Sequence, residues 1–152
     1  MKILIISDSH GKINYIYELM EKEAPDAVIS CGDFSEDTEE SSFAFDNIPF
    51  YVVRGNCDYH DLKHKDEIFV ELEGKKILVT HGHLYDAKRT YLHLTKRGLD
   101  LGADVVIFGH THLPCLDMEP ALTLFNPGAL KNREYGIIKI SKDTVDFIHK
   151  TI

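Results

Sequence analysis

The sequence is poor in cysteine, and its three cysteines form no recognisable pair. Cys31, Cys57 and Cys115 lie far apart, make no CxxC motif and leave an odd thiol. Such a pattern indicates neither a disulfide framework nor a zinc knuckle, and it fits a reducing compartment. We therefore expect a cytoplasmic protein.

Long apolar runs are absent as well. The run from Ile3 to Ile6 ends at Ser7-Asp8, which is far short of the core of a signal peptide. No stretch approaches the roughly 18 apolar residues that a membrane-spanning helix requires. The sequence therefore predicts neither export nor a membrane partner.

Basic residues are also few, with 17 Lys and Arg against 25 Asp and Glu and a formal charge of −8. This excess of negative charge disfavours nucleic acid as a partner, because a sequence-independent grip on the phosphate backbone needs clustered cations. Bound divalent cations would offset part of the negative charge.

Three nucleophile motifs are missing too. The residue six positions after each cysteine is not arginine, as the C-x5-R motif of thiol phosphatases requires. The chain also lacks a G-x-S-x-G elbow and a G-x-x-x-x-G-K loop. These absences exclude the corresponding thiol phosphatase, serine hydrolase and nucleoside-triphosphatase mechanisms.

The length and composition favour an ordinary globular fold. With 152 residues, of which 43% are hydrophobic, the chain is expected to form one domain over residues 1–152 with a sizeable core. Apolar faces that pair in a homo-oligomer look like core residues in a linear sequence, so the oligomeric state stays open.

The first half of the chain alternates strands with helices. Residues 3–6, 27–30 and 50–53 are apolar runs typical of buried strands. Apolar residues recur at helical spacing over 13–20, and the acidic segment 35–47 predicts a second, short helix. This is the start of a βαβ pattern.

The second half changes to hairpins. Residues 68–79 predict two strands joined by a turn. A helix is expected over 86–101, with Tyr91, Leu92 and Leu99 among its buried residues, and it leads to a strand at 105–108. The last three strands are expected at 122–125, 136–140 and 144–148, with a final turn at Lys142-Asp143. The order of elements predicts an α/β fold, a layered sandwich of two mixed β-sheets flanked by helices.

Five short segments place polar residues at the ends of successive predicted strands, and they contain five of the nine histidines. The segments are Asp8-Ser9-His10, Gly32-Asp33, Gly55-Asn56-Cys57-Asp58, His81-Gly82-His83 and Gly109-His110-Thr111-His112. Each one alone has an ordinary explanation as a turn or a helix cap. Turn chemistry does not explain seven oxygen or imidazole ligands at five strand ends, where ligands gather in such sheets. We therefore interpret the set as a metal site.

In this order, the five segments resemble the signature of the calcineurin-like metallophosphoesterases: D-x-H, G-D, G-N-[HC]-[DE], a His-Gly segment and G-H-x-H. The resemblance runs from Lys2 to about Gly128. It is closest to the small single-domain phosphodiesterases of bacteria and archaea. It implies the metallophosphoesterase fold and hydrolysis of a phosphoric ester.

The resemblance also implies a ligand set. It places Asp8, His10 and His112 on one divalent ion and Asn56, His81 and His110 on another, with Asp33 bridging both. Two ions about 3.5–4 Å apart can hold a hydroxide between them and lower the pKa of water, which supplies a nucleophile near neutral pH. Since a carboxylate can bridge two ions, Asp33 is expected to be the least replaceable ligand.

The oxygen and imidazole donors restrict the metal. They fit manganese, iron, zinc or nickel better than calcium, and the absence of cysteine ligands argues against structural zinc. Manganese is the first expectation for the two ions, with nickel, iron, zinc and magnesium left open.

Cys57 stands where many relatives of this family have a histidine that protonates the leaving oxygen. A neutral thiol is a poor general acid, so either good leaving groups are favoured or His83 donates the proton. The neighbouring Asp58 is interpreted as orienting a ligand histidine or Asn56, with a turn carboxylate as the alternative.

The sequence therefore predicts a dinuclear, metal-dependent phosphodiesterase acting on a small phosphodiester. Phosphomonoester hydrolysis is one alternative. The other is a metal-binding interaction scaffold without turnover, because the same family includes a retromer subunit whose metal site is degraded. In this chain every ligand position of the signature is filled.

Overall fold

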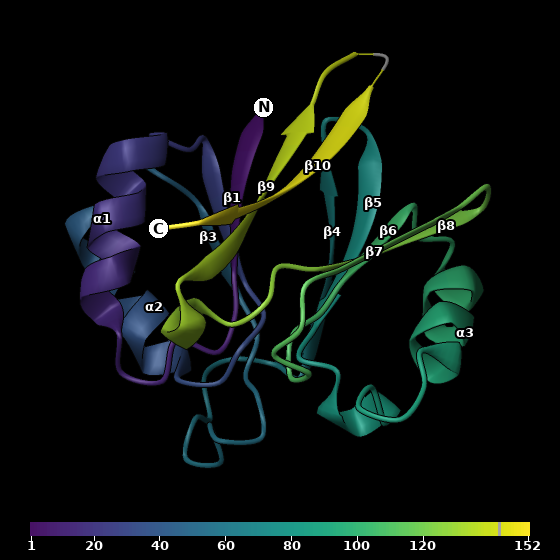
Figure 1. The fold of residues 1–152 in the computed structure, drawn as a ribbon, viewed down its shortest axis with the longest axis horizontal. Helices are drawn as coiled ribbons and strands as arrows, with labels where there is room; N and C mark the ends of the chain where they lie inside the picture. Colours follow the sequence, from purple (N-terminus) through teal and green to yellow (C-terminus); the bar gives the residue numbers. More distant parts are fainter. Residues whose placement is uncertain (143) are drawn as a thin grey trace.

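Two five-stranded sheets lie against each other, and helices cover their outer faces (Figure 1). The computed structural model describes residues 1–142 and 144–152. Both sheets contain parallel and antiparallel pairs. This architecture confirms the predicted layered α/β sandwich of two mixed sheets.

The first sheet has the strand order β10-β9-β1-β2-β3, and its three strands from the first half of the chain run parallel. The strands are β1 (Lys2–Ile6), β2 (Ala27–Ser30), β3 (Phe50–Val52), β9 (Glu134–Ile140) and β10 (Val145–Thr151). Helices α1 (Ile13–Glu23) and α2 (Ser35–Ala44) flank this sheet (Figure 1).

The second sheet has the order β4-β5-β6-β8-β7, with β5, β6 and β8 parallel. Its strands are β4 (Glu67–Leu72), β5 (Lys75–Thr80), β6 (Val105–Ile107), β7 (Cys115–Glu119) and β8 (Leu122–Asn126). Helix α3 (Leu92–Leu101) packs on its outer face, and short 3₁₀ helices η1 (His83–Tyr85) and η2 (Leu130–Asn132) follow β5 and β8.

The apolar run of β1 explains why this strand is central. Ile3 and Ile5 belong to the core between the sheets, whereas Leu4 and Ile6 pack under α1 with Leu19. All five side chains are at most 1% exposed. Burial of one such side chain contributes about 1.5–3 kcal/mol, so the strand is anchored on both faces and its carboxyl end is held in place.

The prediction of a helix over 86–101 was wrong about where the helix begins. Residue Asp86 has a φ of 53°, which is incompatible with a right-handed helix, and α3 begins only at Leu92. Leu92 and Leu99, expected to be buried, are 67% and 49% exposed, and the helix instead packs through Leu94 and Gly98.

Two further details complete the comparison with the expected elements. Strand β7 was not anticipated, because Asp117 and Glu119 interrupt its apolar character. The hairpin of β9 and β10 forms as expected, but Asp143 of its predicted turn lies outside the described residues.

None of the helices in the described part of the chain has the length and hydropathy of a membrane-spanning segment.

A buried carboxylate ties α1 to the first sheet. Glu23, 5% exposed, accepts hydrogen bonds from the Tyr135 hydroxyl and the Lys150 ammonium, both at 2.7 Å, and pairs with Lys2 at 2.7 Å. Burial alone would raise the pKa of Glu23, but Lys150, Lys2 and Tyr135 outweigh it and lower the pKa to about 2.

We expect Glu23→Gln to destabilise the protein by about 2 kcal/mol at neutral pH. Because folding lowers the pKa of Glu23, its ionised carboxylate stabilises the folded protein fully at pH values above its ordinary pKa of 4.5. This stabilisation is lost as the pH falls from 4.5 toward 2. Urea unfolding at neutral pH and at about pH 3 measures the difference. Glu21→Gln, on the exposed side of α1, is the matched control. A deficit that stays the same size at the acidic pH would contradict this account.

Candidate metal centre

The seven assigned ligands lie where strands of both sheets end. Asp8 follows β1, Asp33 comes shortly after β2, and His81 follows β5. The loop after β6 carries His110 and His112. Because β1 and β2 run parallel, as do β5 and β6, the carboxyl ends of each pair lie together. Hydrogen bonds between the loops of the two sheets, from His81 to the Cys31 carbonyl and from the His110 amide to Asp8, bring both pairs of ends to one edge of the sandwich.

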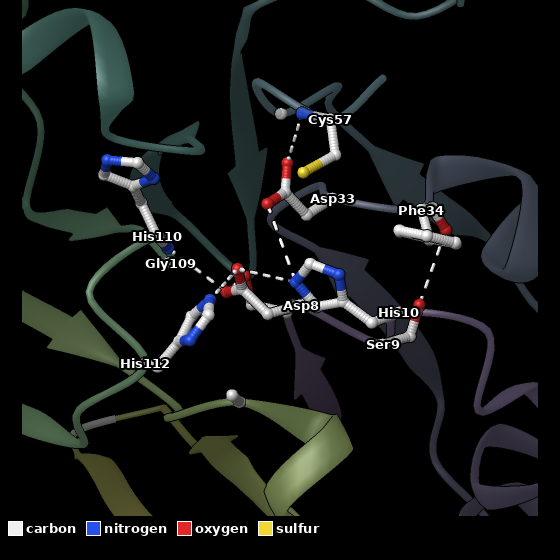
Figure 2. A network of polar contacts seen from close by, with 12 residues as sticks. Asp8, Ser9, His10, Asp33, Phe34, Cys57, Gly109, His110 and His112 are labelled. Atoms are coloured by element: carbon white, nitrogen blue, oxygen red, sulfur yellow. Dashed lines mark hydrogen bonds and ion pairs between the residues drawn. The ribbon is translucent and has the colours of Figure 1, made fainter.

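Four of these side chains form a compact group. The ligand atoms of Asp8, His10, Asp33 and His112 all lie within 4.8 Å of one another. His112 Nε2 is 3.0 Å from Asp8 Oδ1, and His10 Nε2 is 3.9 Å from the same oxygen and 3.7 Å from Asp33 Oδ2. Figure 2 shows the imidazoles of His10 and His112 on either side of the Asp8 carboxylate.

Two atoms of this group are buried without a hydrogen-bond partner among the described residues. They are Asp8 Oδ1 and His10 Nε2. An unpaired buried carboxylate oxygen is costly, and a cation between these atoms would remove the cost. The donor set of two carboxylates and two imidazoles also suits a divalent transition metal. The residues present therefore fit the metal that the sequence predicts.

The other oxygen of Asp8 has a structural role. Asp8 Oδ2 accepts hydrogen bonds from the Ser7 hydroxyl at 2.6 Å and from the His110 amide at 3.1 Å. A Cβ at Gly109 would lie 1.8 Å from Ser7 Oγ and 2.8 Å from Asp8 Oδ2. Only glycine leaves room for this close approach, which fixes the carboxylate and directs Oδ1 toward the histidines.

The second half of the site is built around His81, which is fully buried. His81 Nε2 lies 3.2 Å from Asn56 Oδ1 and 3.4 Å from Asp33 Oδ1. The His110 ring is stacked edge-on at 5.1 Å between ring centroids. Asp33 thus directs one oxygen toward His81 and the other toward His10.

A backbone contact fixes the orientation of the His81 ring. Its Nδ1 lies 2.7 Å from the carbonyl oxygen of Cys31, which can only accept a hydrogen bond. Nδ1 therefore donates a hydrogen bond, and Nε2 is the nitrogen that faces Asn56 and Asp33. Burial opposes protonation of this ring, but Asp33 and Asp8 raise the pKa of His81, and a metal at Nε2 would take the place of the proton that they favour.

The charged side chains of the site shift one another's pKa values. Burial opposes ionisation of Asp33, but hydrogen bonding and charge from His81 and the Cys57 amide hold the pKa of Asp33 well below its usual range. Burial and the charge of His81 lower the pKa of His110 to about 4. Asp33 is thus ionised and His110 neutral near pH 7, which are the forms that bind metal.

The backbone around the site is strained. A left-handed φ is rare for residues other than glycine, and each instance costs roughly 1–3 kcal/mol. Five of the seven assigned ligands adopt it: Asp8 (55°), His10 (46°), Asp33 (58°), His110 (65°) and His112 (59°). Such clustering is typical of functional sites, where surrounding contacts hold the strained conformation.

Comparison with known proteins decides the family. Residues 1–143 match the calcineurin-like phosphoesterase superfamily domain. The chain belongs to this superfamily.

Relatives and solved structures agree with the family. The probable metallophosphoesterase YsnB of Bacillus subtilis is 37% identical over 152 residues, covering 94% of this chain and 86% of YsnB. A phosphodiesterase of Methanocaldococcus jannaschii is 32% identical over 144 residues, covering 84% and 83%. The crystal structure of a predicted phosphoesterase from Streptococcus pneumoniae superposes with a TM-score of 0.81 at 26% identity, covering 99% and 88%.

Cys57, where the phosphoesterase signature allows histidine or cysteine, lies beside Asp33. Its amide donates to Asp33 Oδ1 at 2.8 Å (Figure 2), and its Sγ is 3.5 Å from Asn56 Nδ2. Burial and the Asp33 carboxylate raise the pKa of the Cys57 thiol to about 11. The thiol is therefore neutral near pH 7.

Asp58 accepts hydrogen bonds from four backbone amides. These are the amides of Asp33 at 2.9 Å, Phe34 at 2.7 Å, Ser35 at 2.9 Å and Gly55 at 2.7 Å. We expected its carboxylate to orient a histidine or the Asn56 side chain, with a turn carboxylate as the alternative; neither of those side chains is among its partners in the described residues, and its contacts match the alternative. Asp58 instead fixes the backbone of the Gly32-Asp33 turn and the start of α2.

His83 lies on η1 with its ring 5.4 Å from His81 and 6.1 Å from His110 between centroids. Its Nδ1 is buried and has no hydrogen-bond partner within the described chain. Burial and the charge of His81 lower the pKa of His83. The side chain is thus close to the assigned ligands His81 and His110.

Sequence reasoning missed residues that support the site without belonging to a motif. Asp37, on α2, contacts the Asp8-Ser9-His10 turn, and Ser7 contacts Asp8. The signal for Asp37 was the polar character of α2, whose buried residues are Ser35, Asp37, Thr38 and Ser41. A helix that buries polar side chains must satisfy them with specific partners.

Proposed function

We propose that this phosphoesterase-superfamily protein is a metal-dependent phosphodiesterase that uses two divalent ions. The placement of Asp33 carries the proposal, because its two oxygens face His10 at 3.7 Å and His81 at 3.4 Å. A carboxylate between two sets of donors is what a bridging ligand requires. The proposal assigns Asp8, His10 and His112 to one ion and Asn56, His81 and His110 to the other.

When bound, two divalent ions supply a water of lowered pKa as nucleophile and neutralise charge on the phosphoryl oxygens. The protein's own residues prepare this chemistry. Asp33 stays ionised because its pKa is lowered, and the Cys31 carbonyl accepts from His81 Nδ1, which leaves Nε2 as the nitrogen directed toward the proposed ion. Asp58 and Gly109 hold the two carboxylates in place.

The substrate we propose is a small phosphodiester. A cavity of about 340 Å³ begins at Cys57, the neighbour of Asn56 in the sequence, and is lined by Asp58, Asp61 and two glutamates among others. Because this lining is acidic, we propose that the cavity takes the uncharged leaving alcohol and not the phosphate itself. The net charge of −8 disfavours long nucleic acids as substrates. Phosphomonoesters would be hydrolysed more slowly.

The test compares turnover of bis(para-nitrophenyl) phosphate with that of the matching monoester, using metal-stripped protein to which manganese, nickel, zinc, iron or magnesium is returned. We expect diester hydrolysis to exceed monoester hydrolysis and manganese to restore the most activity. Monoester hydrolysis above diester hydrolysis with every metal would overturn the proposed substrate class. Two bound ions without any turnover would favour a scaffold.

The proposal also predicts a strong dependence of rate on the leaving group. Cys57 supplies a neutral thiol where a protonated histidine would assist departure, so aryl phosphodiesters with more acidic phenols should react much faster. A plot of log kcat/KM against phenol pKa measures the slope. His83→Asn tests the remaining candidate acid. A steeper slope in this variant would identify His83 as the residue that protonates the leaving oxygen. An unchanged slope would mean that the alcohol leaves without a proton from His83. A flat plot for the unmodified protein would contradict the interpretation that Cys57 leaves the site without a general acid.

A further inference from the structure

The turn that carries two of the proposed ligands is held from outside. Asp8 and His10 both have left-handed φ values, and only Ser9 separates them. Two such residues together cost several kcal/mol relative to relaxed backbone. The segment therefore needs contacts that hold it whether or not a metal is bound.

Asp37 supplies these contacts. Its Oδ2 accepts a hydrogen bond from the Ser9 hydroxyl at 2.6 Å and another from the Gly11 amide at 2.9 Å. The two donors flank His10 in the sequence, and Asp37 lies 9% exposed in the first turn of α2. One carboxylate oxygen thus fixes the backbone on both sides of a ligand histidine.

No stabilising ion pair accounts for Asp37 in the described chain. Its carboxylate is buried, yet no lysine or arginine among the described residues pairs with it. Burying a carboxylate without a cation is costly, and hydrogen bonds from Ser9 and Gly11 offset that cost only when the turn has its observed shape. The carboxylate and the turn therefore require each other.

The surrounding helix offers a comparison. Thr38, the next residue and 1% exposed, donates to Ser30 Oγ at 3.0 Å and contacts no part of the Asp8-Ser9-His10 turn through its hydrogen bonds. Thr38 and Asp37 both anchor α2 with polar contacts, but only Asp37 reaches the turn. A purely structural effect of α2 should thus appear equally in variants of either residue.

We propose that Asp37 is a positioning residue for the metal centre, which holds Ser9 and Gly11 so that Asp8 Oδ1 and His10 Nε2 converge on one ion. The inference rests on the proposed function, since it assumes that Asp8 and His10 bind that ion. It assigns Asp37 to the loading of metal, with no contact to substrate. The ion shared by Asn56, His81 and His110 depends less on it.

The experiment titrates metal-stripped protein with manganese against a competing chelator. Asp37→Ala should lower the affinity for one of the two ions by about 10–100-fold, as loss of a hydrogen bond that orients a metal ligand typically does. Ser9→Ala should weaken the same ion less, and Asp37→Asn, which keeps an acceptor oxygen, should recover part of the affinity. Adding Ser9→Ala to Asp37→Ala should cause little further loss, because both remove the same contact.

Thr38→Val is the matched control. It should lower the unfolding temperature of the metal-free protein while leaving manganese affinity unchanged. Asp37→Ala should also recover most of its kcat at saturating manganese, because the substrate-contacting residues are untouched. An affinity loss in Thr38→Val equal to that in Asp37→Ala, or unchanged affinity in Asp37→Ala, would overturn the inference.

Three other outcomes are also decisive. If Asp37→Ala does not fold, Ser9→Ala and Asp37→Asn carry the test, and unchanged affinity in both would overturn the inference. If the unmodified protein binds two ions but the variants match it, only the role of Asp37 fails. If the unmodified protein binds no divalent ion, the proposed function fails and this inference fails with it.

Discussion

Asp33→Asn is expected to lower kcat/KM for a phosphodiester by at least about 10³-fold, which corresponds to several kcal/mol of transition-state stabilisation. An amide of the same shape cannot place a negative oxygen toward each half of the site. It also removes the charge that faces His10 and His81. Both proposed ions should therefore bind more weakly, and the fold should change little.

Steady-state kinetics and metal content of the same preparations measure this effect. Asp117→Asn makes the same chemical change at an exposed position of strand β7 that is not among the assigned ligands, and it should leave both quantities unchanged. Near-normal turnover in Asp33→Asn with two ions retained would contradict a bridging role for Asp33.

Asp58→Ala is expected to have the largest effect on stability, about 3–5 kcal/mol. Four backbone amides lose a charged acceptor at once, and those of Asp33, Ser35 and Gly55 are buried with it. The Gly32-Asp33 turn should loosen, so metal affinity should fall together with stability. A catalytic role for Asp58 alone would lower turnover and leave stability unchanged.

Urea unfolding of the metal-free protein measures the loss, and Asp66→Asn is its control. Asp66 pairs with Arg54 at 2.7 Å, but its side chain is 41% exposed, and such pairs contribute about 0–1 kcal/mol. A stability loss in Asp58→Ala no greater than that in Asp66→Asn would refute the proposed hold on the backbone.

The strands of this fold could be predicted where burial is complete. The runs of β1 and β6 are apolar at every buried position, and β2 departs from this only at its last residue, Ser30, so the type and place of these strands follow from the sequence. Strand β7 escaped because an edge strand needs no continuous apolar run, and four of its five residues are exposed. The start of α3 escaped because the left-handed conformation of Asp86 has no strong sequence signal.

The candidate site could be predicted as a set of residue types but not as a network. Metal-type ligands after strands are visible in the sequence, and the structure brings Asp8, His10, Asp33 and His112 together. The partners of Asp37 and Asp58 are not visible, because a carboxylate that accepts from distant backbone amides leaves no spacing pattern. Their roles follow only from the folded chain.

The most direct test of the central claim is a stepwise manganese titration of metal-stripped protein, with bound ions per chain and hydrolysis of bis(para-nitrophenyl) phosphate measured at each step. The account predicts that two ions bind per chain and that turnover appears only as the second one binds. Full turnover with one bound ion, or none with two, would contradict the dinuclear phosphodiesterase.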